Sequence, residues 1–336
     1  ISKLKKFSII LPVHNGGDYI KECVESILNQ TLNDFNLIVL DNCSSDNTVV
    51  WLQSLNDARI EIINSPVLLS IEENWARALA CKKNEFVTLI GHDDVLLPHY
   101  LEEMNTLILK HPQASLYQSH YNFINSKGEV SGPCKPMDEI QLGHEFLAAQ
   151  MANTINSMGT GYMMRSIDFD AIGGMPVNYP NLIFADYHLW VSLSLLSYKA
   201  TTFKTCFNYR IHNSVSKVTN GEKYAKAFEQ YVYFIADLAN TNSLIKQVAE
   251  RYSYDMIMYY TQSLSHRILK TPKESRQINV NEFIDKCSEY LSLLAPDKTF
   301  DARNRKKIWL AEKFDSNSFT RSTFHIIKRV ADSFSS

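Results

Sequence analysis

Hydrophobic and polar residues alternate in blocks along the first 110 positions, and the blocks predict strands and helices in turn. Four short apolar runs, each followed by polar or glycine-rich residues, predict strands that are buried on both faces. Between them, apolar residues recur at helical spacing, as Ile20, Val24, Ile27 and Leu28 do after Asp18. The predicted strands are residues 7–13, 37–40, 59–63 and 86–90, and the later predicted helices are residues 47–55, 71–81 and 98–110. Regular alternation with short loops predicts a parallel α/β half-domain.

The pattern loosens after residue 110 and becomes almost entirely helical after about residue 217. Between these points it predicts strands at 114–120, 159–164 and 200–211, a loop at 128–136, and helices at 142–151 and 186–196. The later predicted helices are residues 222–239, 244–269, 280–294, 303–313 and 321–334. We therefore expect an α/β domain over residues 1–216, divided into halves 1–110 and 111–216, and a helical region over residues 217–336.

Composition narrows the functional classes. The chain has 336 residues, of which 45% are hydrophobic and 21% charged, as in a soluble globular protein. A formal net charge of −2 argues against a nucleic-acid partner. Six scattered cysteines without a Cys-x-x-Cys pair favour reduced thiols in a cytoplasmic protein. Neither a run of eighteen apolar residues nor a secretory signal occurs, so we expect no membrane span.

Polar residues follow the first two predicted strands, where parallel sheets collect their ligands. The first strand runs into His14-Asn15-Gly16-Gly17 and the second into Asp41-Asn42. The Asp41 carboxylate can accept hydrogen bonds from a base or a ribose hydroxyl. Its alternative role is that of a turn aspartate that accepts from local backbone donors. The glycine-rich sequences of dinucleotide-binding and P-loop proteins are absent, so neither class is supported.

The fourth predicted strand leads into two adjacent carboxylates, Asp93 and Asp94. Desolvated carboxylates this close repel each other unless a positive charge lies between them. A divalent cation that also holds a diphosphate satisfies this requirement, and oxygen ligands suit Mg or Mn. The alternative is an Asp-Asp turn that caps the helix starting near Pro98.

Five stretches in this order resemble the motifs of the inverting glycosyltransferases of family 2, which have the GT-A fold. The resemblance extends over residues 7–216 and does not cover residues 217–336. The stretches are residues 11–17 with 25–31, residues 39–48, residues 91–98, residues 185–190 and residues 209–216.

The resemblance implies a fold and a set of site residues. The fold is a mixed, mainly parallel sheet flanked by helices, with a Rossmann-like nucleotide-binding half, an acceptor half and a helical C-terminal extension. The implied cation, Mn or Mg, would bind Asp93, Asp94 and His212, although Gly91 stands where relatives have the first acid of the metal motif. The implied donor-binding residues are Pro12, Val13, His14, Asn15, Asp41, Asn42, Arg77, His92, Asp93 and Arg210. As alternatives, Arg210 and His212 only brace the loop, and Arg77 is a solvated helix-face side chain.

Asp186 is the expected catalytic residue. Inverting transfer needs one base to take the proton of the acceptor hydroxyl while that oxygen attacks the anomeric carbon. Asp186 opens the predicted helix 186–196, where a carboxylate is stabilised, and the same position suits a plain helix N-cap. Relatives often have Glu before this Asp, where this chain has Ala185.

Together these features predict a metal-dependent inverting glycosyltransferase. It would move a sugar from a nucleotide-diphosphate donor to a hydroxyl of a glycan or lipid-linked saccharide in surface polysaccharide assembly. UDP is favoured as the nucleotide, and GDP and dTDP remain open. The alternative is a non-catalytic nucleotide- or glycan-binding relative with a degraded metal site, which Gly91 and Ala185 suggest.

The C-terminal region adds a basic cluster, Arg303, Arg305, Lys306 and Lys307, before the amphipathic segment 321–334. Basic amphipathic helices bind anionic membranes. One expectation is therefore peripheral contact with the inner membrane face, which would be consistent with a lipid-linked acceptor at the inner leaflet. The alternative is packing against the core or against a homodimer partner.

Overall fold

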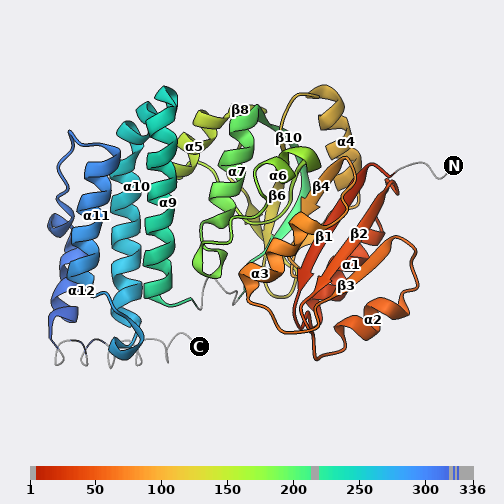
Figure 1. The fold of residues 1–336 in the computed structure, drawn as a ribbon, viewed down its shortest axis with the longest axis horizontal. Coiled ribbons are helices and arrows are strands. Elements are labelled where there is room, and N and C mark those ends of the chain that lie inside the picture. Colours follow the sequence, from red (N-terminus) through yellow and green to blue (C-terminus); the bar gives the residue numbers. More distant parts are fainter. Residues whose placement is uncertain (1–4, 213–218, 318–320, 322–323, 325–336) are drawn as a thin grey trace. The chain divides into compact units, whose positions relative to one another are not determined.

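The computed structural model describes residues 5–212, 219–317, 321 and 324. It divides into two compact units, one of residues 1–150 and 154–214, the other of residues 151–153 and 215–336 (Figure 1). Most of the predicted segment 321–334 and the end of the motif at 209–216 lie outside the described residues.

The first unit contains a mixed sheet whose parallel half comes from the N-terminal 90 residues. Its strands in spatial order are β3 (Ile60–Asn64), β2 (Phe35–Asp41), β1 (Phe7–Val13) and β4 (Phe86–Leu89). Every residue of β1 and β4 is buried, as the unbroken apolar runs predict. Because Val13 of β1 pairs with Asp41 of β2, the polar turns after these two strands begin at the same level of the sheet.

The sheet continues beyond β4 with strands of both directions. β9 (Tyr162–Arg165) is antiparallel to β4 and to β6 (Leu116–Ile124), and β10 (Tyr198–Arg210) is parallel to β6. The mixed, mainly parallel sheet agrees with the predicted fold class. Short strands that the apolar pattern did not indicate complete it. They are β5 (Val95–Leu96), β7 (Val130–Pro133), which lies where a loop was predicted, and β8 (Ile140–Leu142).

The helices of this unit follow the predicted pattern closely. In α1, Ile20, Cys23, Val24 and Ile27 are buried on one face. The predicted helix over 71–81 is an α-helix only to Ala76 and continues as a 3₁₀ turn, Arg77–Ala80. The helices are α1 (Tyr19–Leu28), α2 (Thr48–Ser54), α3 (Ile71–Ala76), α4 (Tyr100–Lys110), α5 (Gly143–Met151), α6 (Ser166–Ala171), which was not predicted, and α7 (Ala185–Leu196).

The second unit is a helical bundle in which α10 (Ser243–Lys270) contacts α9 (Gly221–Thr241), α11 (Val280–Leu294) and α12 (Lys306–Ser316) (Figure 1). A Cβ atom at Gly221 would lie 2.6 Å from the Ile268 backbone, so glycine is what allows α9 to start this close to α10. Among the described helices, none has both the length and the apolar character needed to cross a bilayer.

Candidate active site

The turns after β1 and β2 are joined by the side chain of Asn15. Its Oδ1 accepts hydrogen bonds from the backbone N–H groups of Ser45 at 2.8 Å and Asp46 at 3.3 Å, and its own N–H donates to Ser44 Oγ at 2.9 Å. Asn15 has a φ of 50°, which asparagine tolerates better than most residues. The neighbouring His14 is exposed, with Nδ1 2.8 Å from the Asn42 carbonyl oxygen. The turns after β1 and β2, which are distant in sequence, thus form one continuous hydrogen-bonded surface.

Asp41, at the end of β2, offers an unused acceptor. The residue is 2% exposed, and its Oδ2 accepts from the Ser44 N–H at 3.3 Å. Its Oδ1 is buried and has no hydrogen-bond partner among the described residues. Leaving a buried acceptor unsatisfied costs about 1–3 kcal/mol, which an N–H or O–H group of a ligand would recover. Pro12 and Val13 lie buried in β1 beside it.

Two predicted donor-binding residues hold the protein around Asp41. Asn42 is 4% exposed, and its side chain exchanges two hydrogen bonds with the backbone of Leu69, at 2.8 and 3.0 Å. Arg77 donates to the carbonyl oxygens of Asp41 at 2.9 Å and Ile63 at 2.5 Å. Arg77 is therefore not the solvated side chain of the alternative prediction, and its guanidinium is engaged by protein acceptors. It braces the ends of β2 and β3.

Asp94 is committed to the interior of the protein. It is 1% exposed, its Oδ2 accepts from Thr160 Oγ1 at 2.5 Å, and its Oδ1 accepts from the Arg210 backbone N–H at 2.9 Å. Burial, and then the charge of Asp93, raise the pKa of the Asp94 carboxyl well above its usual range. Both oxygens already serve protein donors, so the geometry gives no support to the predicted role of Asp94 as a metal ligand.

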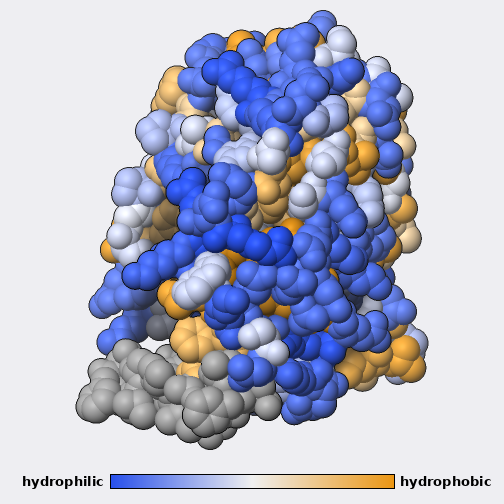
Figure 2. Space-filling model, turned by 90° about the vertical axis from the view of Figure 1, so that its left-hand side faces the viewer, coloured by the Kyte–Doolittle hydropathy of each residue, from blue (hydrophilic) through white to orange (hydrophobic). Residues whose placement is uncertain are grey.

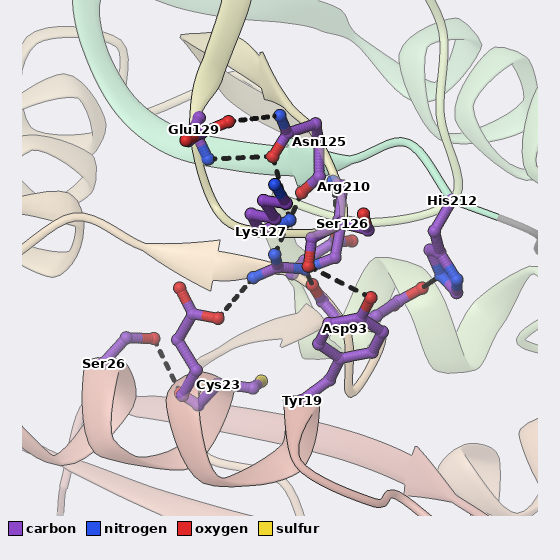
Figure 3. A network of polar contacts seen from close by, with 12 residues as sticks. Tyr19, Cys23, Ser26, Asp93, Asn125, Ser126, Lys127, Glu129, Arg210 and His212 are labelled. Atoms are coloured by element: carbon purple, nitrogen blue, oxygen red, sulfur yellow. Dashed lines mark hydrogen bonds and ion pairs between the residues drawn. The ribbon is translucent and has the colours of Figure 1, made fainter.

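Asp93 and His212 form the open part of the acid site (Figure 3). Asp93 Oδ2 lies 2.5 Å from His212 Nε2, and both side chains are partly exposed. Burial lowers the pKa of the adjacent His92, an effect that Asp93 opposes. In the part of the chain that the structure describes, no three His, Cys, Asp or Glu side chains converge into a metal cluster. Two ligands still suit Mg²⁺ or Mn²⁺ if phosphate oxygens and water complete the coordination, as is usual for Mg²⁺.

Gly91, which stands where the metal motif of relatives has its first acid, lies against the Asp93 carboxylate. A Cβ atom at Gly91 would lie 2.7 Å from Asp93 Oδ1. The Asp93 carboxylate thus occupies the space that a side chain at position 91 would need. Glycine at position 91 therefore suits the local packing, because it leaves room for the Asp93 carboxylate.

Arg210 is buried beneath the acid site. Its side chain is 1% exposed, donates from Nε to the Asp93 carbonyl oxygen at 2.7 Å, and forms an ion pair with Glu22 (Figure 3). A guanidinium held in this way cannot reach a diphosphate without leaving these partners. The geometry therefore agrees with the bracing alternative for Arg210 rather than with direct donor contact.

Asp186 lies in the first turn of α7 but is not its N-cap. The helix begins at Ala185, and the N-cap position is Phe184, with φ 67° and no side-chain cap hydrogen bond. The N-cap alternative for Asp186 is therefore wrong. Asn181 and Leu182 also have positive φ, and such strained backbone clusters at functional sites. Asp186 is half-buried, and burial raises the pKa of its carboxyl to about 6.

A glycine-rich loop connects Asp186 with the acid pair. Thr160 binds Asp94, and the next residue back, Gly159, faces Asp186, whose Oδ2 would lie 4.0 Å from a Cβ atom there. Burial and then the charges of Asp94, Asp93 and Asp186 raise the pKa of Tyr209, so all three acids lie close enough to act on this side chain. The loop of Gly159 and Thr160 thus brings a desolvated carboxylate, Asp186, near the acid-bearing turn.

Comparison with known proteins identifies the family of this domain. Residues 8–169 match the family model described as glycosyl transferase family 2. An uncharacterized glycosyltransferase of Haemophilus influenzae is 24% identical over 282 residues, which are 79% of this chain and 83% of that protein. The Escherichia coli UDP-Glc:alpha-D-GlcNAc-diphosphoundecaprenol beta-1,3-glucosyltransferase WfgD is 25% identical over 189 residues, which are 55% of this chain and 68% of that protein.

Solved structures show the same fold. The crystal structure of residues 1–349 of S. aureus TarS in complex with UDP-GlcNAc superposes with a TM-score of 0.70 at 16% identity, covering 92% of this chain and 91% of that one. The mannosyltransferase PcManGT of Pyrobaculum calidifontis, in complex with GDP-Man and Mn²⁺, gives a TM-score of 0.52 at 11% identity, covering 96% and 87%. At these identities the likeness concerns the fold.

Proposed function

Since residues 8–169 of this glycosyltransferase belong to family 2, we propose that it catalyses an inverting, metal-dependent sugar transfer. The donor is a nucleotide-diphosphate sugar, and the acceptor is a hydroxyl of a glycan or a lipid-linked saccharide. UDP is favoured because WfgD and TarS are described with UDP-sugars. The observation that carries the proposal is the half-buried Asp186, with a pKa raised to about 6, beside the loop that binds Asp94.

Each residue has a distinct part in the proposed reaction. Asp41 Oδ1 accepts a hydrogen bond from the base of the nucleotide. Asp93 and His212 would hold the cation, which would supply positive charge to neutralise the departing diphosphate. Asp186 takes the proton of the acceptor hydroxyl as that oxygen attacks the anomeric carbon from the face opposite the leaving group. A base with a pKa near 6 is deprotonated at neutral pH and still strong enough to accept the proton.

A donor screen tests this proposal. We expect one of UDP-, GDP- and dTDP-sugars to bind with an affinity that rises at least tenfold when Mn²⁺ is added, and to release its nucleoside diphosphate. Binding is measured by titration calorimetry and release by a coupled nucleotide assay. No metal-dependent binding to any donor by the folded chain would contradict the proposal.

A second candidate is a binding protein without turnover. It is favoured by the lack of a three-residue metal cluster among the described residues. The same screen separates the two candidates when acceptors are included. Donor affinity without nucleotide release, in the presence of glycan and lipid-linked acceptors, would favour the binder.

We propose that this protein is cytoplasmic and makes peripheral contact with an anionic membrane. Arg305, Lys306 and Lys307 are exposed at the start of α12, where positive charge opposes the helix dipole, so they do not stabilise this helix. Trp309, 45% exposed, follows within one turn. The face of the helical unit seen in Figure 2 is mostly hydrophilic, so a contact there would depend on charge.

Vesicle flotation tests the membrane contact. We expect the full chain to float with phosphatidylglycerol vesicles at low salt and to stay unbound with phosphatidylcholine vesicles. The variant with Arg305, Lys306 and Lys307 changed to Gln should lose at least tenfold in binding, since each basic residue near the surface contributes about 1 kcal/mol. A charge-matched control neutralises exposed lysines elsewhere, Lys82, Lys246 and Lys273. Equal binding by both variants would disprove the contact.

A further inference from the structure

Glu22 lies on α1, outside the residues that hold the cation or act as base, yet it contacts the group beneath them. Its Oε2 is 2.5 Å from Arg210 Nη2, and Glu22 is 48% exposed where Arg210 is 1% exposed. The carboxylate therefore reaches inward from the surface to a buried guanidinium. A buried guanidinium without a contacting carboxylate would be strongly destabilised, because an uncompensated charge is costly in the protein interior.

Arg210 joins the helix of Glu22 to two other segments (Figure 3). Nε donates to the Asp93 carbonyl oxygen at 2.7 Å, and Nη1 donates to the Asn125 carbonyl oxygen at 3.1 Å. The guanidinium also lies over the ring of Tyr19, 4.6 Å from its centroid. The turn between β6 and β7, the start of α1 and the acid-bearing loop are thus fixed by one side chain.

The contacts of Arg210 hold the backbone near the two proposed metal ligands, Asp93 and His212. Asp93 is held at its carbonyl oxygen by Arg210, and His212 follows Arg210 by two residues. The Asp93 carboxylate and the His212 ring lie 2.5 Å apart. Neighbouring ligands of an octahedral Mg²⁺, each about 2.1 Å from the ion, lie about 3 Å apart. The pair therefore needs only a small separation to admit a cation, provided that both backbones stay in place.

We propose that Glu22 is a positioning residue for the cation. Its ion pair with Arg210 keeps the backbone of Asp93 and the end of β10 at the spacing that lets Asp93 and His212 bind one ion. The role assigned to this ion rests on the proposed function. Glu22 itself touches neither the ion nor the substrate.

The test compares Glu22→Gln with Glu25→Gln in the full chain. Glu25 is exposed one turn later on the same helix and serves as the matched control. For Glu22→Gln we expect the apparent affinity for Mn²⁺ in the presence of UDP to fall about tenfold, with UDP affinity in EDTA unchanged. Glu22→Asp, which keeps the charge, should recover part of the loss, and Glu25→Gln should match the wild type.

Two results would overturn the proposal. One is unchanged Mn²⁺ affinity in Glu22→Gln. The other is an equal loss of UDP affinity with and without metal, together with a lower melting temperature, which indicates a merely structural role. If Glu22→Gln does not fold, the same two titrations are made on Glu22→Asp, and the same two results would overturn the proposal. Absence of Mn²⁺-dependent binding of UDP, GDP and dTDP alike in the wild type would instead count against the proposed function, and the two failures are thereby distinguished.

Discussion

Replacing Asp186 with Asn is expected to reduce sugar transfer by about 10²–10⁴-fold, the usual contribution of a general base. An amide cannot take the proton of the acceptor hydroxyl, whereas its size and polarity preserve the packing against Gly159. Donor affinity should therefore change little, and the loss should appear in kcat. Initial rates of transfer and a donor titration measure the two quantities separately. Full transfer activity in the variant would exclude Asp186 as the base.

The pH dependence gives an independent check on Asp186. Burial raises the pKa of its carboxyl to about 6, and only the deprotonated form is a base. Wild-type kcat/KM should therefore fall as the pH drops below about 6, and this limb should be missing from the residual activity of the Asn variant.

As the pH rises, the free energy of unfolding should fall while the activity rises. Because the folded pKa of Asp186 is raised, the folded state binds more protons than the unfolded state between about pH 4 and 6, and stability contributed by this group is lost over that window as the pH rises. At pH 8 the Asn variant should unfold with a free energy higher by up to about 3 kcal/mol. Asp168→Asn is the matched control, because Asp168 is a first-turn aspartate of α6 whose pKa is also raised by burial.

Replacing Asp93 with Asn is expected to lower transfer by at least about 10²-fold and to remove most of the Mn²⁺ dependence of UDP binding. Charge stabilisation by a bound cation is worth several kcal/mol, and each 1.4 kcal/mol changes a rate tenfold. Metal-free UDP affinity should persist, because Asp41 lies at a different strand end. Calorimetric titration of UDP with and without Mn²⁺, followed by rate measurements, provides the comparison.

Glu139→Gln is the control for Asp93→Asn. Glu139 accepts from His111 Nε2 at 2.9 Å, so this variant also disrupts a His–carboxylate pair, away from the acid site. It should keep the full response to Mn²⁺. If Asp93→Asn kept that response as well, the cation would have to bind elsewhere.

The apolar pattern was most informative where burial was complete. In β1 all seven residues are buried, and the predicted strand has the observed bounds, Phe7–Val13. In α11 the predicted and observed bounds also coincide, at Val280–Leu294. The two residues of β5 were not predicted, because their pairing with β10 depends on a strand more than 100 residues away. A window of sequence that short carries no periodicity.

The site residues were predictable as residue types, but their partners were not. The motifs placed Arg210 near the acids, yet no pattern in the chain indicated that its guanidinium would turn inward to Glu22, 188 positions away. Thr160 was expected only as part of the predicted strand 159–164, and its hydrogen bond to Asp94 depends on the approach of this segment to the acid-bearing turn. The direction of a side chain follows from tertiary packing, which a motif does not encode.

The joined turns after β1 and β2 bear on how tightly a donor can bind. Ordering one residue of backbone costs about 1–2 kcal/mol of conformational entropy at room temperature. Through Asn15 both turns are already hydrogen-bonded to each other, so a nucleotide that settles against them would not have to order them. More of its contact energy would then remain as affinity, as in any rigid, preformed receptor. If a nucleotide binds at these turns, Asn15 would raise its affinity by ordering them beforehand.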